Sequence, residues 1–333
     1  MPYQTFQGGR RQRRRGSRIL AALILVACVA VAATIFVKRD PKPQAAVGPT
    51  PQAPLTDTGT APLAGGGTAP SPLAVQLDGT GDTVSVRFKQ PPRSALLFDL
   101  DTGRVLYRHE PTRVLPIASL TKMMTALVVV DRVPEGSKVR VTKQALAYQG
   151  SGVGVLPKGK WVGLSAMLYG LLLPSGNDAA IALAQRAART VPRFVRLMNA
   201  KAEALGLVCT RFSSPSGFVD KGNHSCASDL AAIARAVLRQ PRLARIVGRR
   251  DAQLPFPIKG GKLWLYNNNP LLRQNYPGTT GVKTGYTAAA GSCLVATARR
   301  GPVKLGVVLL HSPNTGKQAM QLLDRGFRAE RAG

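Results

Sequence analysis

Apolar residues in this chain form two patterns: short runs near residue 100 and near the C-terminus, and longer stretches between them. The runs at residues 95–100 and 104–108 flank Asp101-Thr102-Gly103, a sequence typical of a tight turn, and they predict a β-hairpin. Residues 84–88 alternate in polarity and predict a short strand before it. Three more strands are predicted close to the C-terminus, at residues 279–286, 292–298 and 304–310.

The longer apolar stretches predict helices. The stretch at residues 120–130 predicts a helix that is buried on most sides and begins at Ser119. Further helices are predicted at residues 164–172, 179–187 and 317–325. Strands near both ends of the folded part, with helices between them, indicate an α+β fold whose first and last strands pair in one sheet.

The N-terminus has a pattern typical of an exported protein. Six arginines occur within residues 1–18, an uncharged apolar segment follows at residues 19–37, and Lys38 and Arg39 end it. A helix of this length rises roughly 28 Å, about the hydrocarbon thickness of a bilayer. The arginines before the segment predict a cytoplasmic basic tail at residues 1–18, a transmembrane anchor at residues 19–37 and an extracytoplasmic remainder.

Two other interpretations of residues 19–37 remain open. Ala30-Val31-Ala32 has the small-x-small pattern of a signal-peptide cleavage site, and Leu25-Val26-Ala27-Cys28 resembles the lipobox of a lipoprotein signal. We favour the retained anchor because the apolar run continues through Val37, longer than the roughly 7 to 15 residues of a signal-peptide core.

A stretch of distinct composition lies between residues 19–37 and the folded part of the chain. From Pro41 to about Pro72 the sequence is rich in Pro, Ala, Gly and Thr and has few large apolar residues, so it cannot bury enough surface to fold. We therefore predict an extended linker at residues 38–91 and one folded domain at residues 92–329.

The charge of the chain is strongly positive. The formal net charge is +30, and residues 91–333 alone hold 35 Lys/Arg and 12 Asp/Glu, a net charge of +23. Such a surface attracts polyanions. Export places the domain away from cytoplasmic DNA, so nucleic acid is not an expected partner. The expected polyanions are membrane headgroups and anionic wall polymers.

Three short motifs carry hydroxyl, amine and amide groups in a fixed order: Ser119-Leu120-Thr121-Lys122, Ser175-Gly176-Asn177 and Lys283-Thr284-Gly285. None contains histidine, so together they indicate a serine nucleophile activated by lysine. Their predicted positions are a helix start, a loop between helices and a strand, at separations of 56 and 108 residues. This ordered placement favours one shared site over three chance matches.

The spacing within the first motif suits acyl transfer. Ser119 lies at a helix N-terminus, where backbone N–H groups favour developing negative charge, and Lys122 follows three residues later on the same helix face. A lysine acts as a base only when it is neutral, which requires desolvation or a second cation such as Lys283. The alternative is structural: Ser119 as a helix cap, Lys122 as a surface lysine, Ser175 and Asn177 as turn residues.

The motifs and their flanking residues resemble the D-alanyl-D-alanine carboxypeptidases, low-molecular-weight penicillin-binding proteins of the serine penicillin-recognising superfamily. The resemblance covers about residues 94–327, including Ala118-Ser119-Leu120-Thr121-Lys122-Met123-Met124, Leu172-Leu173-Pro174-Ser175-Gly176-Asn177-Asp178 and Gly281-Val282-Lys283-Thr284-Gly285-Tyr286-Thr287. It implies a β-lactamase/transpeptidase-like fold, in which helices flank an antiparallel sheet and form a helical subdomain.

The resemblance also implies roles for individual residues. Ser119 would attack the penultimate D-alanine carbonyl of a peptidoglycan stem peptide, Lys122 would accept its proton and Ser175 would relay a proton to the leaving D-alanine. The substrate-binding residues would be Asn177, which binds a substrate amide, Lys283 and Thr284, which bind the terminal carboxylate, and Gly285 and Tyr286. The backbone N–H groups of Ser119 and Tyr286 would form the oxyanion hole. β-Lactams would act as inhibitors that acylate Ser119.

Other activities remain as alternatives. A class A β-lactamase needs a glutamate in a Glu-x-x-Leu-Asn context, which this sequence lacks, so we expect slow deacylation of penicillin. A D,D-endopeptidase that cuts D-alanyl cross-links is not separated from a carboxypeptidase by sequence. A non-catalytic wall-binding protein is disfavoured because every residue of the three motifs is present.

The remaining polar residues predict no metal and no cofactor. His109, His224 and His311 are isolated and lack the spacing of metal ligands. Asp178 and Asp229 are expected to begin helices. We expect a turn without chemistry at residues 215–217.

The cysteines leave one question open. Relatives tend to have alanine or an aliphatic residue near Cys209 and Cys226, so the resemblance is compatible either with a lineage-specific disulfide between them or with two thiols. Cys293 would then be a buried strand residue.

Overall fold

The computed structural model describes residues 71–79, 81–219 and 221–332. Within these ranges, no helix combines the length and the apolar character that a membrane crossing requires. The predicted basic tail and anchor at residues 1–37 lie outside the described residues, as does most of the predicted linker.

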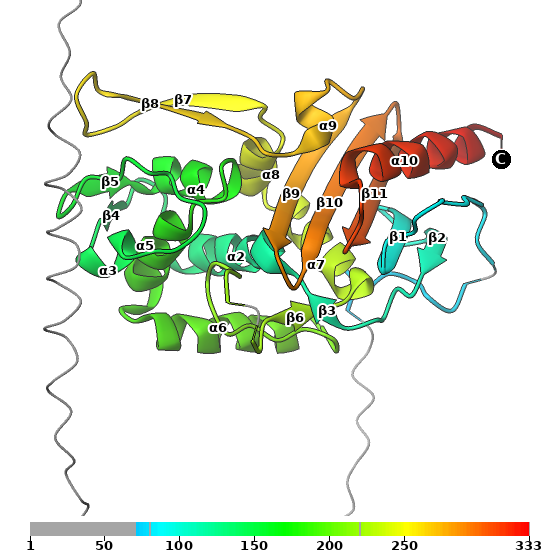
Figure 1. The fold of residues 1–333 in the computed structure, drawn as a ribbon, viewed down its shortest axis with the longest axis horizontal. Helices are drawn as coiled ribbons and strands as arrows, with labels where there is room; N and C mark the ends of the chain where they lie inside the picture. The colour runs from blue at the N-terminus through cyan, green and yellow to red at the C-terminus, as the bar shows by residue number, and fades with distance from the viewer. Residues whose placement is uncertain (1–70, 80, 220, 333) are drawn as a thin grey trace, which may run out of the picture. The chain divides into compact units, whose positions relative to one another are not determined.

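A five-stranded antiparallel sheet organises the domain, with its strands in the order β2-β1-β11-β10-β9 (Figure 1). The strands are β1 (Ser94–Asp99), β2 (Val105–His109), β9 (Thr279–Thr287), β10 (Gly291–Arg300) and β11 (Val303–Leu310). Strands β1 and β11 pair in a register that sets Ser94 opposite Leu310 and Asp99 opposite Leu305. The predicted hairpin and the pairing of the first and last strands are both confirmed.

Alternate residues of the central strands belong to two separate hydrophobic cores. Val295 and Val308 face one core, whereas Leu294 and Val307 face the other. Because successive side chains in a strand point to opposite faces, a strand that is apolar at every position must be covered on both sides. This is why β10 and β11 read as nearly continuous apolar runs.

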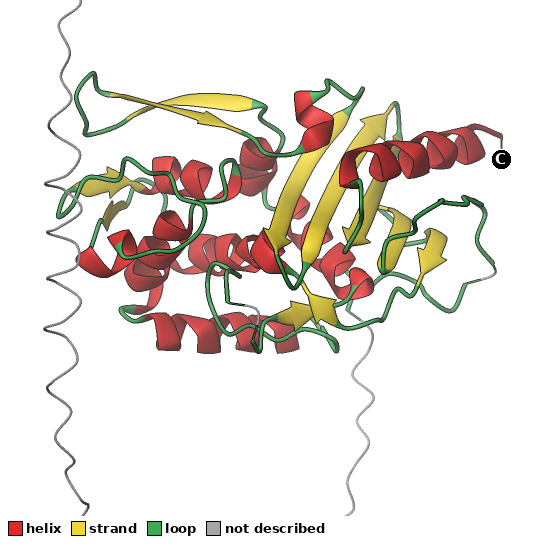
Figure 2. Cartoon of the chain, viewed as in Figure 1, coloured by secondary structure: helices red, strands yellow, loops and turns green. Residues whose placement is uncertain are grey.

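Helices cover both faces of the sheet (Figure 2). Helix α10 (Thr315–Ala332) packs on β10 and β11 on one side, with Leu322, Leu323 and Phe327 buried in the smaller core. On the other side α7 (Ala227–Arg239) contacts β1, β10 and β11, and α8 (Pro241–Val247) contacts β9.

The remaining helices form the predicted helical subdomain next to the sheet (Figure 1). They are α2 (Lys122–Arg132), α3 (Lys143–Leu146), α4 (Leu164–Leu172), α5 (Asn177–Ala188) and α6 (Val191–Ala204). The smaller elements are β3 (Leu115–Pro116), η1 (Ala118–Thr121), β4 (Lys138–Arg140), β5 (Trp161–Gly163), β6 (His224–Ser225), β7 (Asp251–Pro255), β8 (Lys262–Tyr266) and α9 (Pro270–Arg273).

The predicted helix at residues 164–172 coincides with α4, and the prediction at residues 179–187 lies inside α5. Helix α10 extends beyond the predicted 317–325 at both ends, and its buried face continues to Phe327. The predicted strand at residues 84–88 is wrong: the segment is not a strand, although the Val84 N–H donates to the Leu106 carbonyl at 2.9 Å. One such bond anchors the segment without making a ladder.

Part of the predicted linker packs on the domain. Leu73 and Val84 are buried, and Arg235 donates hydrogen bonds to the carbonyls of Leu73 and Ala74, both at 2.8 Å. Residues 71–79 and 81–91 therefore contribute contacts to the same packed unit as residues 92–329.

Cys209 and Cys226 form a disulfide across the base of the loop that they delimit. Backbone hydrogen bonds in both directions between Arg211 and His224, each 3.0 Å, hold the two ends of this loop together next to the disulfide. Asp229 of α7 accepts hydrogen bonds from the Cys209 N–H and the Thr210 hydroxyl, both at 2.7 Å. Asp229 thus ties the loop to α7.

Replacing both cysteines by serine should lower the free energy of unfolding by about 3 kcal/mol, because the disulfide limits the conformational entropy of the unfolded chain. Urea denaturation of the wild type and of Cys209→Ser/Cys226→Ser measures the difference. Reductant should reproduce the loss in the wild type and leave the double variant unchanged. Equal stabilities of the oxidised wild type and the variant would contradict the expectation.

Candidate active site

The three sequence motifs meet at one cleft of about 540 Å³. Five of the predicted site residues line it: Ser119, Ser175, Thr284, Gly285 and Tyr286. The other three, Lys122, Asn177 and Lys283, are buried, with at most 2% of their surface exposed. The cleft thus has a polar lining with two buried amines and an amide nearby.

Ser119 lies in η1, the 3-10 turn that leads into α2. Ala118 immediately before it has φ 48°, a backbone conformation that residues with a side chain rarely adopt. The Thr121 hydroxyl donates to the Ala118 carbonyl at 2.8 Å and helps to hold this turn. No side-chain cap bond is made at the start of η1 or of α2, so Ser119 is not a helix cap.

Lys122 is completely buried, which rules out the interpretation of a surface lysine. Its Nζ lies 2.8 Å from Ser119 Oγ, 2.7 Å from Asn177 Oδ1 and 2.7 Å from the Ser216 carbonyl oxygen. Burial lowers the pKa of Lys122 well below its ordinary value, and the nearby Lys283 lowers it further, against an opposing effect of Asp178.

The three contacts of Lys122 are compatible with the hydrogen-bonding capacity of a neutral amine. Asn177 Oδ1 and the Ser216 carbonyl can only accept hydrogen bonds, so they take the two amine hydrogens. With Lys122 neutral, its lone pair is left for the third neighbour, Ser119 Oγ at 2.8 Å, and can accept the hydroxyl proton. In this state Lys122 is poised to remove the proton of Ser119.

Asn177 begins α5, and both ends of its side chain are engaged. Its Oδ1 accepts from Lys122, and its Nδ2 donates to the carbonyl of Gln149. The structure therefore gives Asn177 a contact with the buried base in addition to the substrate contact implied by the resemblance. Asp178 accepts from the N–H groups of Val153 and Gly154, which positions the preceding loop.

The glycine of the second motif is required by close packing. A Cβ on Gly176 would lie 2.9 Å from the Gly170 carbonyl oxygen and 2.6 Å from Asp178 Oδ1. Ser175 before it has φ 70°, and its Oγ is buried without a hydrogen-bond partner among the described residues. A buried hydroxyl without a partner at the wall of a cleft is suited to bind a group that enters the cleft.

Positions 283 and 285 face the same side of β9, because successive residues of a strand alternate between its two faces. Burial lowers the pKa of Lys283 to about 7, and its Nζ donates to the Thr284 carbonyl at 2.9 Å. Gly285 is required by packing within the domain. A Cβ there would lie 2.9 Å from the Ile117 carbonyl oxygen and 3.1 Å from the Ser119 nitrogen, so the glycine lets β9 pack against the turn that carries Ser119.

The turn at residues 215–217 was expected to have no chemistry, and this expectation is wrong. The Ser216 carbonyl accepts from Lys122, and the Pro215 carbonyl accepts from the Thr125 hydroxyl at 2.7 Å. Gly217 has φ 73°, and a Cβ there would lie 2.0 Å from the Ala118 carbonyl oxygen. Sequence reasoning missed this role because a backbone carbonyl leaves no residue signature; only the turn itself was visible.

A cluster of Cys209, Cys226 and Asp229 is the one group of potential metal ligands found in the described part of the chain. Its two sulfurs are joined in the disulfide, so neither is available as a thiolate ligand. The cluster is explained by the disulfide and its hydrogen bonds.

A serine activated by a buried lysine, with a second hydroxyl and a lysine-bearing strand beside it, defines a serine acyl-transfer enzyme. The sequence model of the D-alanyl-D-alanine carboxypeptidase family matches residues 83–314 of this chain. The chain therefore belongs to this family of serine peptidases.

Characterised relatives agree with this assignment. The chain is 35% identical to D-alanyl-D-alanine carboxypeptidase DacF of Bacillus subtilis over 71% of its own length, but this match spans 62% of the relative. It is 36% identical to DacB2 of Mycobacterium tuberculosis, over 71% of this chain and 82% of the relative. A D-alanyl-D-alanine endopeptidase of Pseudomonas aeruginosa is 35% identical, over 65% of this chain and 70% of the relative.

Solved structures share the fold. A D-alanyl-D-alanine carboxypeptidase of Mycobacterium tuberculosis superposes with a TM-score of 0.69 at 34% identity, over 75% of this chain and 96% of that one. The Streptomyces K15 DD-transpeptidase gives a TM-score of 0.68 at 31% identity, over 73% of this chain and all of that one. The predicted α+β, transpeptidase-like fold is confirmed.

Replacing Lys283 by methionine should change how the rate of Ser119 acylation depends on pH. The acid limb of the pH–rate profile, where the rate falls as the pH is lowered, should move to higher pH. The variant removes a cation that lowers the pKa of Lys122, so that pKa rises and a smaller fraction of Lys122 is neutral at a given pH. The measurement is the rate of labelling by a fluorescent penicillin as a function of pH. The readout is the pH at which the acid limb lies. The rate itself is not used, because loss of carboxylate binding in the variant also lowers it.

Lys143→Met is the matched control, because Lys143 is exposed and distant in sequence from the three motifs. It should leave the acid limb in place. An acid limb in Lys283→Met that stays in place or moves to lower pH would show that Lys283 does not tune Lys122.

Proposed function

We propose that this chain is a serine-type D-alanyl-D-alanine carboxypeptidase that removes the terminal D-alanine from peptidoglycan stem pentapeptides and is inhibited by β-lactams. The observation that carries the proposal is the contact between Ser119 Oγ and the buried Nζ of Lys122, at 2.8 Å. An amine whose pKa is lowered by burial is able to deprotonate a serine at neutral pH.

In the first half of the reaction, neutral Lys122 takes the proton of Ser119 as Oγ bonds to the penultimate D-alanine carbonyl carbon. The backbone N–H groups of Ser119 and Tyr286, both in the lining of the cleft, bind the resulting oxyanion. The C–N bond then breaks, and the proton held by Lys122 passes through the Ser175 hydroxyl to the leaving nitrogen. Free D-alanine and an ester on Ser119 result.

In the second half, water attacks the ester carbonyl while Lys122 again accepts a proton. The C–O bond to Ser119 breaks, Oγ regains its proton, and the shortened peptide leaves. The Glu-x-x-Leu-Asn context of class A β-lactamases is absent, so an acyl-enzyme formed with penicillin is hydrolysed slowly.

The terminal carboxylate of the substrate is bound by Lys283 and Thr284. Lys283 has a pKa of about 7, lowered by burial, so part of the population is charged at neutral pH, and an incoming carboxylate favours the ammonium form. The backbone carbonyl of Thr284 orients the Lys283 amine at 2.9 Å.

Wild-type protein should release D-alanine from a synthetic pentapeptide that ends in D-alanyl-D-alanine, and Ser119→Ala should release none. Ser175→Ala should lower the rate by about 100-fold or more through loss of proton relay. Its free energy of unfolding should stay within about 0.5 kcal/mol of wild type, since the hydroxyl has no partner among the described residues.

A cross-linked muropeptide dimer is the competing substrate in the same assay. Faster cleavage of the dimer than of the pentapeptide would favour the endopeptidase, a name carried by one of the relatives. Equal labelling of wild type and Ser119→Ala by fluorescent penicillin, or rapid penicillin hydrolysis, would overturn the proposal.

We further propose that the domain acts outside the cytoplasm, held at the membrane by residues 19–37. Support comes from the apolar length of that segment, from the arginines before it and from the Cys209–Cys226 disulfide, which is typical of an oxidising compartment. The mass of the membrane-extracted protein should equal that of the full chain. Loss of the first 27 to 35 residues would identify a lipoprotein or a cleaved signal peptide instead.

A further inference from the structure

A second cavity, of about 740 Å³, lies at the end of the sheet opposite the active site. Its wall includes Thr279 and Thr280 at the start of β9, whereas Thr284, Gly285 and Tyr286 near the end of the strand line the active-site cleft. Gly285 is five positions beyond Thr280 in β9, a distance of about 17 Å along the strand. The two linings share no residue, so the second cavity is a separate site.

The cavity is lined by an excess of cations. Its charged lining residues are Arg235, Arg239, Arg245, Arg249, Arg299, Lys304 and a single acid, Asp101. The six cations come from α7, from α8 and the turn after it, and from the ends of β10 and β11 that lie away from the active site. Elements from four parts of the chain therefore direct positive charge to one cavity.

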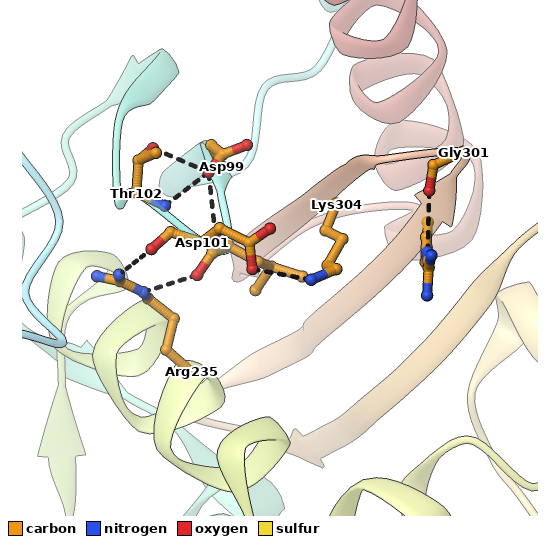
Figure 3. A network of polar contacts seen from close by, with 8 residues as sticks. Asp99, Asp101, Thr102, Arg235, Gly301 and Lys304 are labelled. Carbon is orange, nitrogen blue, oxygen red and sulfur yellow. Dashed lines mark hydrogen bonds and ion pairs between the residues drawn. The ribbon is translucent and has the colours of Figure 1, made fainter.

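The single acid does not balance this charge. Asp101 already pairs with Lys304 at 3.1 Å, between Lys304 and Arg235 in Figure 3. Arg235 is 3% exposed, and its guanidinium donates only to backbone carbonyls, including those of Leu100 and Asp101, both at 2.9 Å. Carbonyls satisfy its hydrogen bonds without cancelling its charge, so the wall of the cavity carries a fixed positive charge.

Three arginines at the cavity are available to a ligand. Arg239, Arg245 and Arg249 are exposed, and their side chains make no hydrogen bond or ion pair with any described residue. Arg245 and Arg249 are four residues apart, as are Arg235 and Arg239. Several guanidinium groups at one cavity suit oxyanions, and phosphates above all, because each guanidinium can bind two oxygens at once.

The uncharged part of the lining narrows the class of ligand. It consists of Leu100, Leu238, Ala244, Gly248 and the two threonines, with no aromatic residue to stack on nucleic-acid bases. The large exposed apolar residues of the described chain, such as Trp161, Trp264 and Val208, lie outside this cavity, so the site lacks an anchor for a lipid surface. Small apolar and hydroxyl groups suit a short polyol spacer between phosphates.

We propose that this cavity binds a phosphodiester-linked anionic polymer, with Arg239, Arg245 and Arg249 on its phosphates and the buried Arg235 as a fixed positive charge behind them. The site is independent of the reaction at Ser119, so one chain can hold the polymer and a substrate peptide together. Binding depends on local charge in the cavity and not only on the net charge of the protein.

The test compares two triple variants that remove the same charge. Arg239→Gln/Arg245→Gln/Arg249→Gln alters the cavity, whereas Arg140→Gln/Arg193→Gln/Arg196→Gln alters exposed arginines elsewhere. Binding of fluorescent poly(glycerol phosphate) is measured at several salt concentrations. The cavity variant should bind the polymer about tenfold more weakly than wild type. The slope of its log binding constant against log salt concentration should be smaller by about two. The affinity of the control should stay within about twofold of wild type.

Equal losses in the two variants would overturn the proposal, because they would reflect net charge alone. Phosphatidylglycerol vesicles and a single-stranded oligonucleotide serve as competing probes. If either binds wild type as tightly as the polymer does, with the same loss in the cavity variant, the polymer is the wrong ligand. Penicillin labelling of Ser119 should be equal in all three proteins, which separates this test from that of the proposed activity.

A second measurement needs no substitution. Phenylglyoxal modifies accessible arginines, and mass spectrometry locates the modified sites. Poly(glycerol phosphate) should protect Arg239, Arg245 and Arg249 of the wild type and leave Arg193 and Arg196 reactive. Uniform protection, or none, would contradict the proposal.

Discussion

The buried amine of Lys122 determines the arrangement of much of the surrounding structure. A charged lysine is costly to bury, and a neutral one needs acceptors for two hydrogens and a donor for its lone pair. These come from Asn177 at the start of α5, from the Ser216 carbonyl and from Ser119 in η1. Three segments that are far apart in sequence must therefore meet at one nitrogen atom.

Close backbone packing makes this meeting geometrically feasible. Gly176, Gly217 and Gly285 each lie where a Cβ would contact a neighbouring backbone atom at 2.9 Å or less. Gly217 and Gly285 approach η1 from two sides, so the turn that carries Ser119 is held between β9 and the disulfide-bonded loop. Two of the three glycines belong to the sequence motifs, and their role is packing within the site.

Sequence was informative where a pattern depends on side chains. Alternating burial in β10 and β11 produced long apolar runs, and the order of hydroxyl, amine and amide groups in the motifs indicated a common site before any geometry was known. The role of Ser216 was missed because its backbone carbonyl makes the contact. The basic cavity was missed for a different reason: Arg235, Arg249, Arg299 and Lys304 are brought together by the tertiary fold, and in the sequence they are part of a general excess of positive charge.

The position of β11 in the sheet has a consequence for the order of folding. This strand lies between β1 and β10, although β1 precedes it by more than 200 residues in the chain. The hairpin of β1 and β2 cannot join β10 and β9 until residues 303–310 have been synthesised and have inserted between them. Contacts of such long sequence separation form slowly. A partly synthesised chain can thus contain Ser119 and Lys122 without the strand β9 in place beside them. The site around Ser119 is therefore completed only when synthesis of the domain is nearly finished.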